Sequence, residues 1–187
     1  MAEPQASVAG SFLDNFVDYV KRALEIVQLN GDEIDRVKSD EDAFTMGLVI
    51  IALSGVAAAI GSMAPFGVVV LPVFYLIGAF IGSGILHLIA TVAFKGEGEF
   101  LDFFRPFAFA YILTWVSVIW VLNFVLTPLA FIWMCVVWVV CVERVYGLDR
   151  PKAIATVAIP VVVLAVLFMM FFAAAMSILL LMTALAQ

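Results

Sequence analysis

The sequence predicts an all-α polytopic membrane protein, a bundle of five transmembrane helices preceded by an amphipathic cytoplasmic helix. The first reason is composition: 66% of the 187 residues are hydrophobic and only 13% are charged, whereas a soluble chain is about half apolar and about a quarter charged. The second is length, because five apolar stretches can each cross a hydrocarbon core. The third is charge, since Lys and Arg gather at one end of these stretches. We expect two regions, a cytoplasmic tail at 1–43 and a membrane domain at 44–187.

The cytoplasmic tail contains one predicted helix. Residues 1–10 are mixed and acidic and predict a disordered tail without a cleavable signal peptide. Residues 11–29 repeat apolar side chains every three or four positions, which predicts an amphipathic helix with Ser11 near its start. Its net charge of −1 attracts anionic lipid poorly, so packing on the bundle and binding to the membrane surface both remain open. Residues 31–42 are interpreted as an acidic linker, either solvated or a docking surface for a basic partner or a cation.

The first two spans are predicted at 44–62 and 73–94, joined by an uncharged turn at 63–72. Both spans carry small residues four positions apart, which lets helices approach closely in lipid. The residues expected to form this helix contact are Gly55, Ala59, Gly78 and Gly82.

A charged, glycine-punctuated hinge at 95–99 and a short amphipathic piece at 100–106 follow the second span. The third and fourth spans are predicted at 106–122 and 124–146, because a single helix through this apolar stretch would be too long for one crossing. Asn123, Thr127 and Pro128 mark the expected reversal.

The fifth span is predicted at 153–186, after a last loop in which Gly147 ends one helix and Asp149 caps the next. A helix of this length exceeds the bilayer thickness, so it must project, tilt or bend, and Pro160 is the expected bend. Its methionines predict adaptable packing.

Charge predicts the topology. The nine Lys and Arg fall as four in the N-terminal segment, two at the hinge and three in the last loop, with none on the other side. The positive-inside rule therefore places the N-terminus in the cytoplasm and the C-terminus outside. The N-terminal helix, the hinge and the last loop would form the working surface. The residues expected to contact a partner or lipid there are Lys95, Arg105, Arg144, Arg150 and Lys152.

Catalytic chemistry is not indicated. His87 and Asn123 form a possible intramembrane polar site, although a histidine hydrogen-bonded near the headgroups is the preferred explanation of His87. Cys135 and Cys141 lie on different helix faces, so we expect buried small hydrophobes, with lipidation of Cys141 as the alternative. The sequence has no metal cluster, nucleophile motif or phosphate-binding loop, which predicts a non-enzymatic protein without cofactors. The net charge of −6 argues against nucleic acid as a partner.

Two stretches carry a family resemblance. The run HLIATVAFKGEGEFLDFFRPFAFAY resembles the second-to-third-span connection of the Yip family, and VERVYGLDRPKAIATVAIP resembles its fourth-to-fifth connection. The resemblance covers about residues 44–185 and implies five spans with a cytoplasmic N-terminus. The family is known for interaction with Rab GTPases, but the DLYGP-like motif of its eukaryotic members is missing here, so the chain looks most like a prokaryotic member in the cytoplasmic membrane.

Three functions are consistent with these observations. The first is a non-enzymatic scaffold or adaptor whose cytoplasmic face engages a protein partner or lipid. The second is an accessory subunit of a larger membrane complex, or a homo-oligomer, held by its small-residue faces. The third is a small transporter or channel, for which a cavity lined by His87, Ser83, Asn123, Thr114 and Ser117 would be required.

Overall fold

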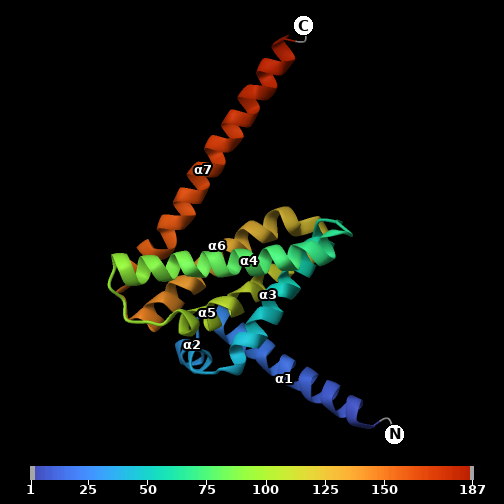
Figure 1. Ribbon diagram of the computed structural model, residues 1–187, viewed down its shortest axis with the longest axis vertical. Coiled ribbons are helices and arrows are strands. Elements are labelled where there is room, and N and C mark those ends of the chain that lie inside the picture. Colours follow the sequence, from blue (N-terminus) through green and yellow to red (C-terminus); the bar gives the residue numbers. More distant parts are fainter. Residues whose placement is uncertain (1–2, 186–187) are drawn as a thin grey trace.

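The computed structural model describes residues 3–185 and contains helices only over that range. Figure 1 shows a bundle from which the last helix projects on one side, while the two N-terminal helices lie on the other side. The elements are α1 Glu3–Val27, α2 Gly31–Lys38, α3 Asp42–Gly61, α4 Gly67–Leu88, the π-helix η1 Ile89–Ala93, α5 Phe100–Phe109, the 3-10 segments η2 Ala110–Val118 and η3 Trp120–Leu122, α6 Asn123–Tyr146 and α7 Arg150–Leu185.

Five helical stretches are long and apolar enough to cross a membrane, as predicted: Asp42–Gly61, Gly67–Ala93, Phe100–Val118, Trp120–Tyr146 and Arg150–Leu185. The hinge and the last loop lie at one end of these spans, which we call the charged end. The turns at 62–66 and 119–122 lie at the other, the uncharged end.

Aromatic side chains of α5 form the centre of the core. Phenylalanine occupies five of the ten positions of this short helix, and Phe103, Phe104, Phe107 and Phe109 are all buried. Phe107 stacks on Trp138 of α6 with ring centroids 4.6 Å apart, and Phe104 stacks on Phe80 of α4 at 4.5 Å. Such offset ring pairs add to the free energy of burial. The third span is therefore the central helix of the bundle.

Close approach of α3 and α4 depends on Gly55. A Cβ at Gly55 would lie 2.4 Å from both the backbone nitrogen and the Cα of Pro72, so only glycine fits there. Ala59 lies at the same helix contact, because its Cβ is 3.3 Å from the position that a Cβ on Gly67 would take. The predicted contribution of Gly78 and Gly82 was wrong, because both lie away from α3.

The N-terminal segment is more helical than predicted. The helix begins at Glu3, not at Ser11, since Pro4 in the first turn and the following glutamine and alanine favour a helix. The expected disordered tail was therefore wrong from Glu3 onward, and its first two residues lie outside the described range. The linker prediction was also wrong. Residues Gly31–Lys38 form α2, which Asn30 caps by accepting hydrogen bonds from the backbone N–H groups of Asp32 and Glu33.

Two helix boundaries near the uncharged end differ from the predicted ones. The turn after α3 is shorter than expected, because α4 begins at Gly67 and contains Pro72. The reversal between the third and fourth spans comes earlier than expected, at Ile119, whose φ of −80° and ψ of 81° leave the helical region. Asn123 begins α6 and Pro128 lies inside it, so neither residue forms the reversal between the two spans.

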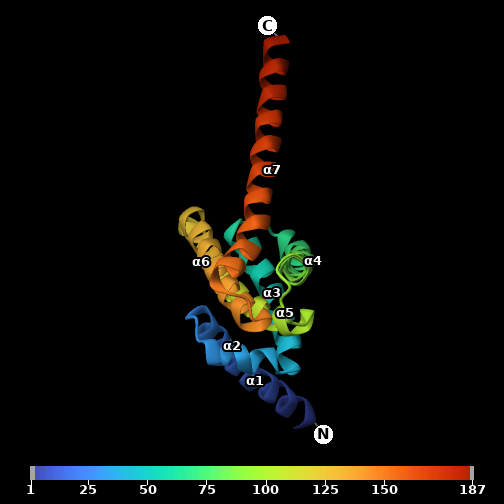
Figure 2. The same cartoon turned by 90° about the vertical axis from the view of Figure 1, so that its left-hand side faces the viewer.

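At the charged end, the predicted amphipathic piece and the third span are one helix, because α5 begins at Phe100 and continues through Pro106. The last span begins at Arg150, slightly before the predicted start, and α7 continues through Pro160 as one helix of 36 residues. Its predicted end at Ala186 lies outside the described residues. Figure 2 shows the same projection of α7 from a second direction. Its base is buried at Ala153, Thr156 and Val157, whereas residues 162–178 and 182–185 are all exposed.

Candidate functional site

Tyr146 joins the hinge and the last loop at the charged end. Its backbone carbonyl accepts a hydrogen bond from the N–H of Glu97 at 3.2 Å. Its hydroxyl is hydrogen-bonded to Nδ1 of His87 at 2.8 Å, and its ring packs on Phe103 with centroids 5.3 Å apart. Two loops separated by about fifty residues of sequence are therefore held as one surface by a single residue.

The close contact between the hinge and Tyr146 requires glycine at two hinge positions, Gly96 and Gly98. A Cβ at Gly96 would lie 2.7 Å from Cβ of Tyr146, and a Cβ at Gly98 would lie 2.6 Å from its ring and 2.8 Å from the carbonyl of Val145. Lys95 has a left-handed φ of 60°, which ends the π-helix and turns the chain toward α6. Residues 95–99 (KGEGE) therefore pack closely against Tyr146, and we call this segment the hinge clasp.

A polar cleft of about 460 Å³ opens beside the hinge clasp. Its walls come from the end of η1, the clasp, the last turn of α6 and the start of α7. The charged side chains that line it are Lys95, Glu97, Arg144, Asp149 and Lys152. The lining thus carries three cations and two carboxylates, a combination that suits a ligand presenting both a negative group and hydrogen-bond donors.

The structure brings together three of the five basic residues expected at this surface. Lys95, Arg144 and Lys152 line the cleft. Arg150 lies at the start of α7 with its side chain 75% exposed, at 3.8 Å from Glu143. Arg105 is separate from them, because its side chain is only 12% exposed and donates to the carbonyl of Lys38 at 2.6 Å. Arg105 therefore caps the C-terminal end of α2 instead of facing a partner.

Acidic residues neutralise part of the basic surface. Arg144 pairs with Asp35 of α2 at 3.1 Å, and Lys152 pairs with Asp149 at 2.9 Å. No ion pair of Lys95 is found among the described residues. Of the three cations that line the cleft, Lys95 is therefore the one most available to a ligand.

His87 and Asn123 do not form one polar site. His87 lies next to the charged end, on Tyr146, and its ring meets Phe100 edge to face at 5.7 Å. Asn123 lies at the uncharged end, where its amide donates to the carbonyl of Gly61 at 3.3 Å and its oxygen accepts from Thr127. Each fastens two spans together at opposite ends of the bundle.

Two of the polar residues that a transporter cavity would need, Ser83 and Thr114, bond instead to the backbone of their own helical segments. Ser83 donates to the carbonyl of Phe80 and Thr114 to that of Tyr111. The cavity beside Gly78 and Gly82 is apolar, holds about 160 Å³, and is bounded by Phe107, Trp138 and the α7 residues around Pro160.

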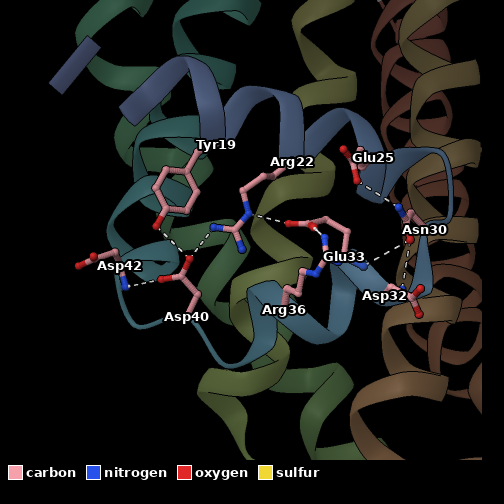
Figure 3. A network of polar contacts seen from close by, with 9 residues as sticks. All are labelled: Tyr19, Arg22, Glu25, Asn30, Asp32, Glu33, Arg36, Asp40 and Asp42. Carbon is pink, nitrogen blue, oxygen red and sulfur yellow. Dashed lines mark hydrogen bonds and ion pairs between the residues drawn. The ribbon is translucent and has the colours of Figure 1, made fainter. Parts of the chain in front are cut away.

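A network of ion pairs in the N-terminal segment was missed by the sequence analysis (Figure 3). Arg22 of α1 bonds to Glu33 of α2 at 2.6 Å and to Asp40, before α3, at 2.5 Å. Tyr19 donates to the same Asp40 carboxylate at 3.0 Å, and Arg36 also contacts Glu33. Figure 3 shows these side chains converging from α1, α2 and the α2–α3 connection. The available signal was Asn30, a helix N-cap followed three residues later by Glu33.

The electrostatics of the network favour its charged form. Burial opposes ionisation of Asp40, but hydrogen bonds from Arg22 and Tyr19 outweigh it, so the pKa of Asp40 is lowered. Burial, together with the Asp40 carboxylate, raises the pKa of Tyr19 to about 12. The phenol therefore stays a donor and the carboxylate an acceptor at neutral pH.

Comparison with known proteins gives one match. A family model described as the Yip1 domain matches residues 30–173. No curated protein and no solved structure matches the chain. The matched range includes α2, the hinge clasp, the cleft and the base of α7.

Proposed function

Because the chain belongs to the Yip1 domain family of multi-pass membrane proteins, and because its charged surface is gathered at one end, we propose that it is a non-enzymatic membrane scaffold or adaptor. Its cytoplasmic face engages a protein partner or a lipid headgroup. The observation that supports this proposal is the polar cleft, whose walls are fixed by the hinge clasp on Tyr146.

Rigidity supports a recognition role for the cleft. Flexible loops lose conformational entropy on binding, whereas a preformed cleft loses little. Here the clasp is held by a backbone hydrogen bond, two tight glycine contacts and the His87–Tyr146 bond. The turns at the uncharged end carry no charged side chain, so they offer a partner few specific contacts.

Orientation is part of the proposal. Following the positive-inside rule, the charged end faces the cytoplasm, and the C-terminus lies outside a cytoplasmic membrane of prokaryotic type. Labelling of single cysteines, in a background of Cys135→Ala and Cys141→Ala, tests it. Glu99→Cys should react only from the cytoplasmic side and Phe66→Cys only from the other, since both native side chains are exposed. The reverse pattern would refute the orientation.

Charge reversal tests the working surface. Lys95→Glu with Lys152→Glu should remove the proteins or anionic lipids that copurify with wild type in mild detergent, because a carboxylate repels the negative group that these ammonium groups attract. Arg150→Glu is the matched control, since Arg150 is more exposed but lies outside the cleft lining. Unchanged copurification in the double variant, with loss after an uncharged-end change such as Phe66→Ala, would refute the proposal.

A second candidate is an accessory subunit of a larger complex, or a homo-oligomer. It is favoured by α7, because every described side chain from Val162 onward is exposed. Mass measurement of the intact complex from native membranes distinguishes the two. A stoichiometric second chain, or a second copy, that crosslinks to Leu164 would favour the subunit, whereas a single chain with lipid only would exclude it.

A further inference from the structure

Helix α1 has four distinct sides, and the first is docked on the bundle. Tyr19, Ala23 and Ile26 are buried against α5 and η2. The ring of Tyr19 meets Phe109 edge to face at 6.0 Å, and the indole N–H of Trp133 in α6 donates to the carbonyl of Val27 at 2.8 Å. The docked side therefore lies on residues that belong to the membrane spans.

The second and third sides are polar. On one flank, Arg22 reaches across to Glu33, so α2 covers that flank. Opposite the docked side lies a face of exposed charged residues: Asp14, Asp18, Lys21 and Glu25. Carboxylates and ammonium groups at these positions require water, so this face marks the aqueous side of α1.

The fourth side is apolar and uncovered. Leu13 is 59% exposed, Val17 is 51% exposed and Leu24 is 46% exposed, and Val20 between them is partly exposed. These positions follow a spacing of four, three and four residues, which places them in one line along the helix. We call this line the α1 stripe. It lies on the flank opposite α2, between the docked side and the charged face.

This placement identifies what covers the stripe. The docked side rests on membrane-spanning residues and the charged face needs water, so the flank between them lies at the boundary of lipid and water. Figure 1 and Figure 2 both place α1 on the side of the bundle opposite to the projecting part of α7, so α7 does not cover this flank.

A second copy of the chain fits the stripe less well than lipid does. Four side chains, about half exposed, offer far less than the roughly 800 Å² per partner that a standard protein interface buries. An interfacial helix needs only a narrow apolar face that enters the headgroup and acyl boundary by about 5–10 Å.

We propose that the α1 stripe inserts into the lipid bilayer at its interface, so that α1 is bound to protein on one side and to acyl chains on the next. The acids of α1 outnumber its basic residues, so attraction to anionic headgroups does not drive the insertion. Burial of apolar surface drives it, and the insertion is therefore independent of headgroup charge. Its ligand class is the acyl region of a glycerophospholipid membrane.

The test uses nitroxide labels on the full chain in nanodiscs, in the background of Cys135→Ala and Cys141→Ala. Labels at Val17 and Leu24 report on the stripe, and labels at Asp18 and Glu25, each one position further along, are matched controls. All four native side chains are exposed, so the labels fit without repacking. Collision with oxygen, which partitions into lipid, is compared with collision with a water-soluble nickel chelate.

If the stripe inserts into lipid, the stripe labels and the control labels should rank in opposite order for collision with oxygen and for collision with nickel. The stripe labels should collide severalfold more with oxygen and severalfold less with nickel than their controls, equally in neutral and in anionic nanodiscs. Equal nickel access at all four labels would overturn the proposal, because the stripe would then face water. Protection of the stripe from both probes, with spin coupling between copies, would also overturn it, because a second chain would then cover the stripe.

Discussion

Replacing Gly55 by alanine tests whether α3 and α4 depend on backbone contact. The added methyl group would lie 2.4 Å from the backbone nitrogen and Cα of Pro72 and 2.7 Å from the carbonyl carbon of Leu71. Backbone atoms inside a helix cannot move as a side chain can, so α4 must shift as a whole. Overpacking of this kind costs about 1–3 kcal/mol, and the helix preference of alanine over glycine returns up to about 1 kcal/mol. We expect a net loss of about 1 kcal/mol, which lowers the Tm by about 2–4 °C for a chain of this size.

Gly78→Ala is the matched control, because it is the same change in an apolar span. No atom outside its own helix backbone lies within 4 Å of the position that the methyl group would take. The helix preference therefore acts alone, and we expect unchanged or slightly raised stability. Thermal unfolding of both variants in one detergent measures the difference. A loss of stability in Gly78→Ala equal to that in Gly55→Ala would contradict the geometric explanation.

Three further perturbations address the charged end. Gly98→Ala should open the hinge clasp, because the methyl group overlaps the ring of Tyr146, and should raise hydrogen exchange at 95–99 while the spans stay protected. The lowered pKa of Asp40 contributes stability above the ordinary carboxyl pKa of about 4, and this contribution is lost as pH falls through the lowered value. Wild type should therefore release α1 on acidification in this range, whereas Asp40→Asn should show weak docking at every pH when exchange is corrected for intrinsic rate. Arg105→Gln should cost about 1.5–3 kcal/mol, since it removes a charged donor from a mostly buried site, but Arg150→Gln should stay within about 0.5 kcal/mol.

The spans were predictable because hydropathy acts over about twenty residues and tolerates local irregularity. Their ends were less so. Pro72 and Pro128 were interpreted as turn residues, yet each lies inside a helix, because a spanning helix can tolerate proline where neighbouring helices and local adjustments satisfy the freed backbone groups. The helix at 11–29 was predicted, but its first turns were mistaken for a tail and α2 for a linker. Helix α2 is short and gains its stability from docking, as the buried Ile34 and Val37 show.

The site was half predictable. The sequence indicated that the hinge and the last loop share one end, since charge and topology require it. It gave no sign that Tyr146 joins them, because that depends on packing between residues distant along the chain. GxxxG spacing pointed equally to Gly55 and to Gly78, and only the crossing point of α3 and α4 decides which glycine is in contact.

The bond between Trp133 and the carbonyl of Val27 joins residues 106 positions apart, and the Arg144–Asp35 pair joins residues 109 apart. During synthesis α1 emerges long before the segment of α6 that receives it. At about 5–20 residues per second, roughly 5–20 s separate the two events. Until α5 and η2 have also emerged, the helix exposes two apolar sides instead of one. The nascent chain therefore needs an early binding surface for α1. The order in which the spans are translated determines when the N-terminal segment can dock on the bundle.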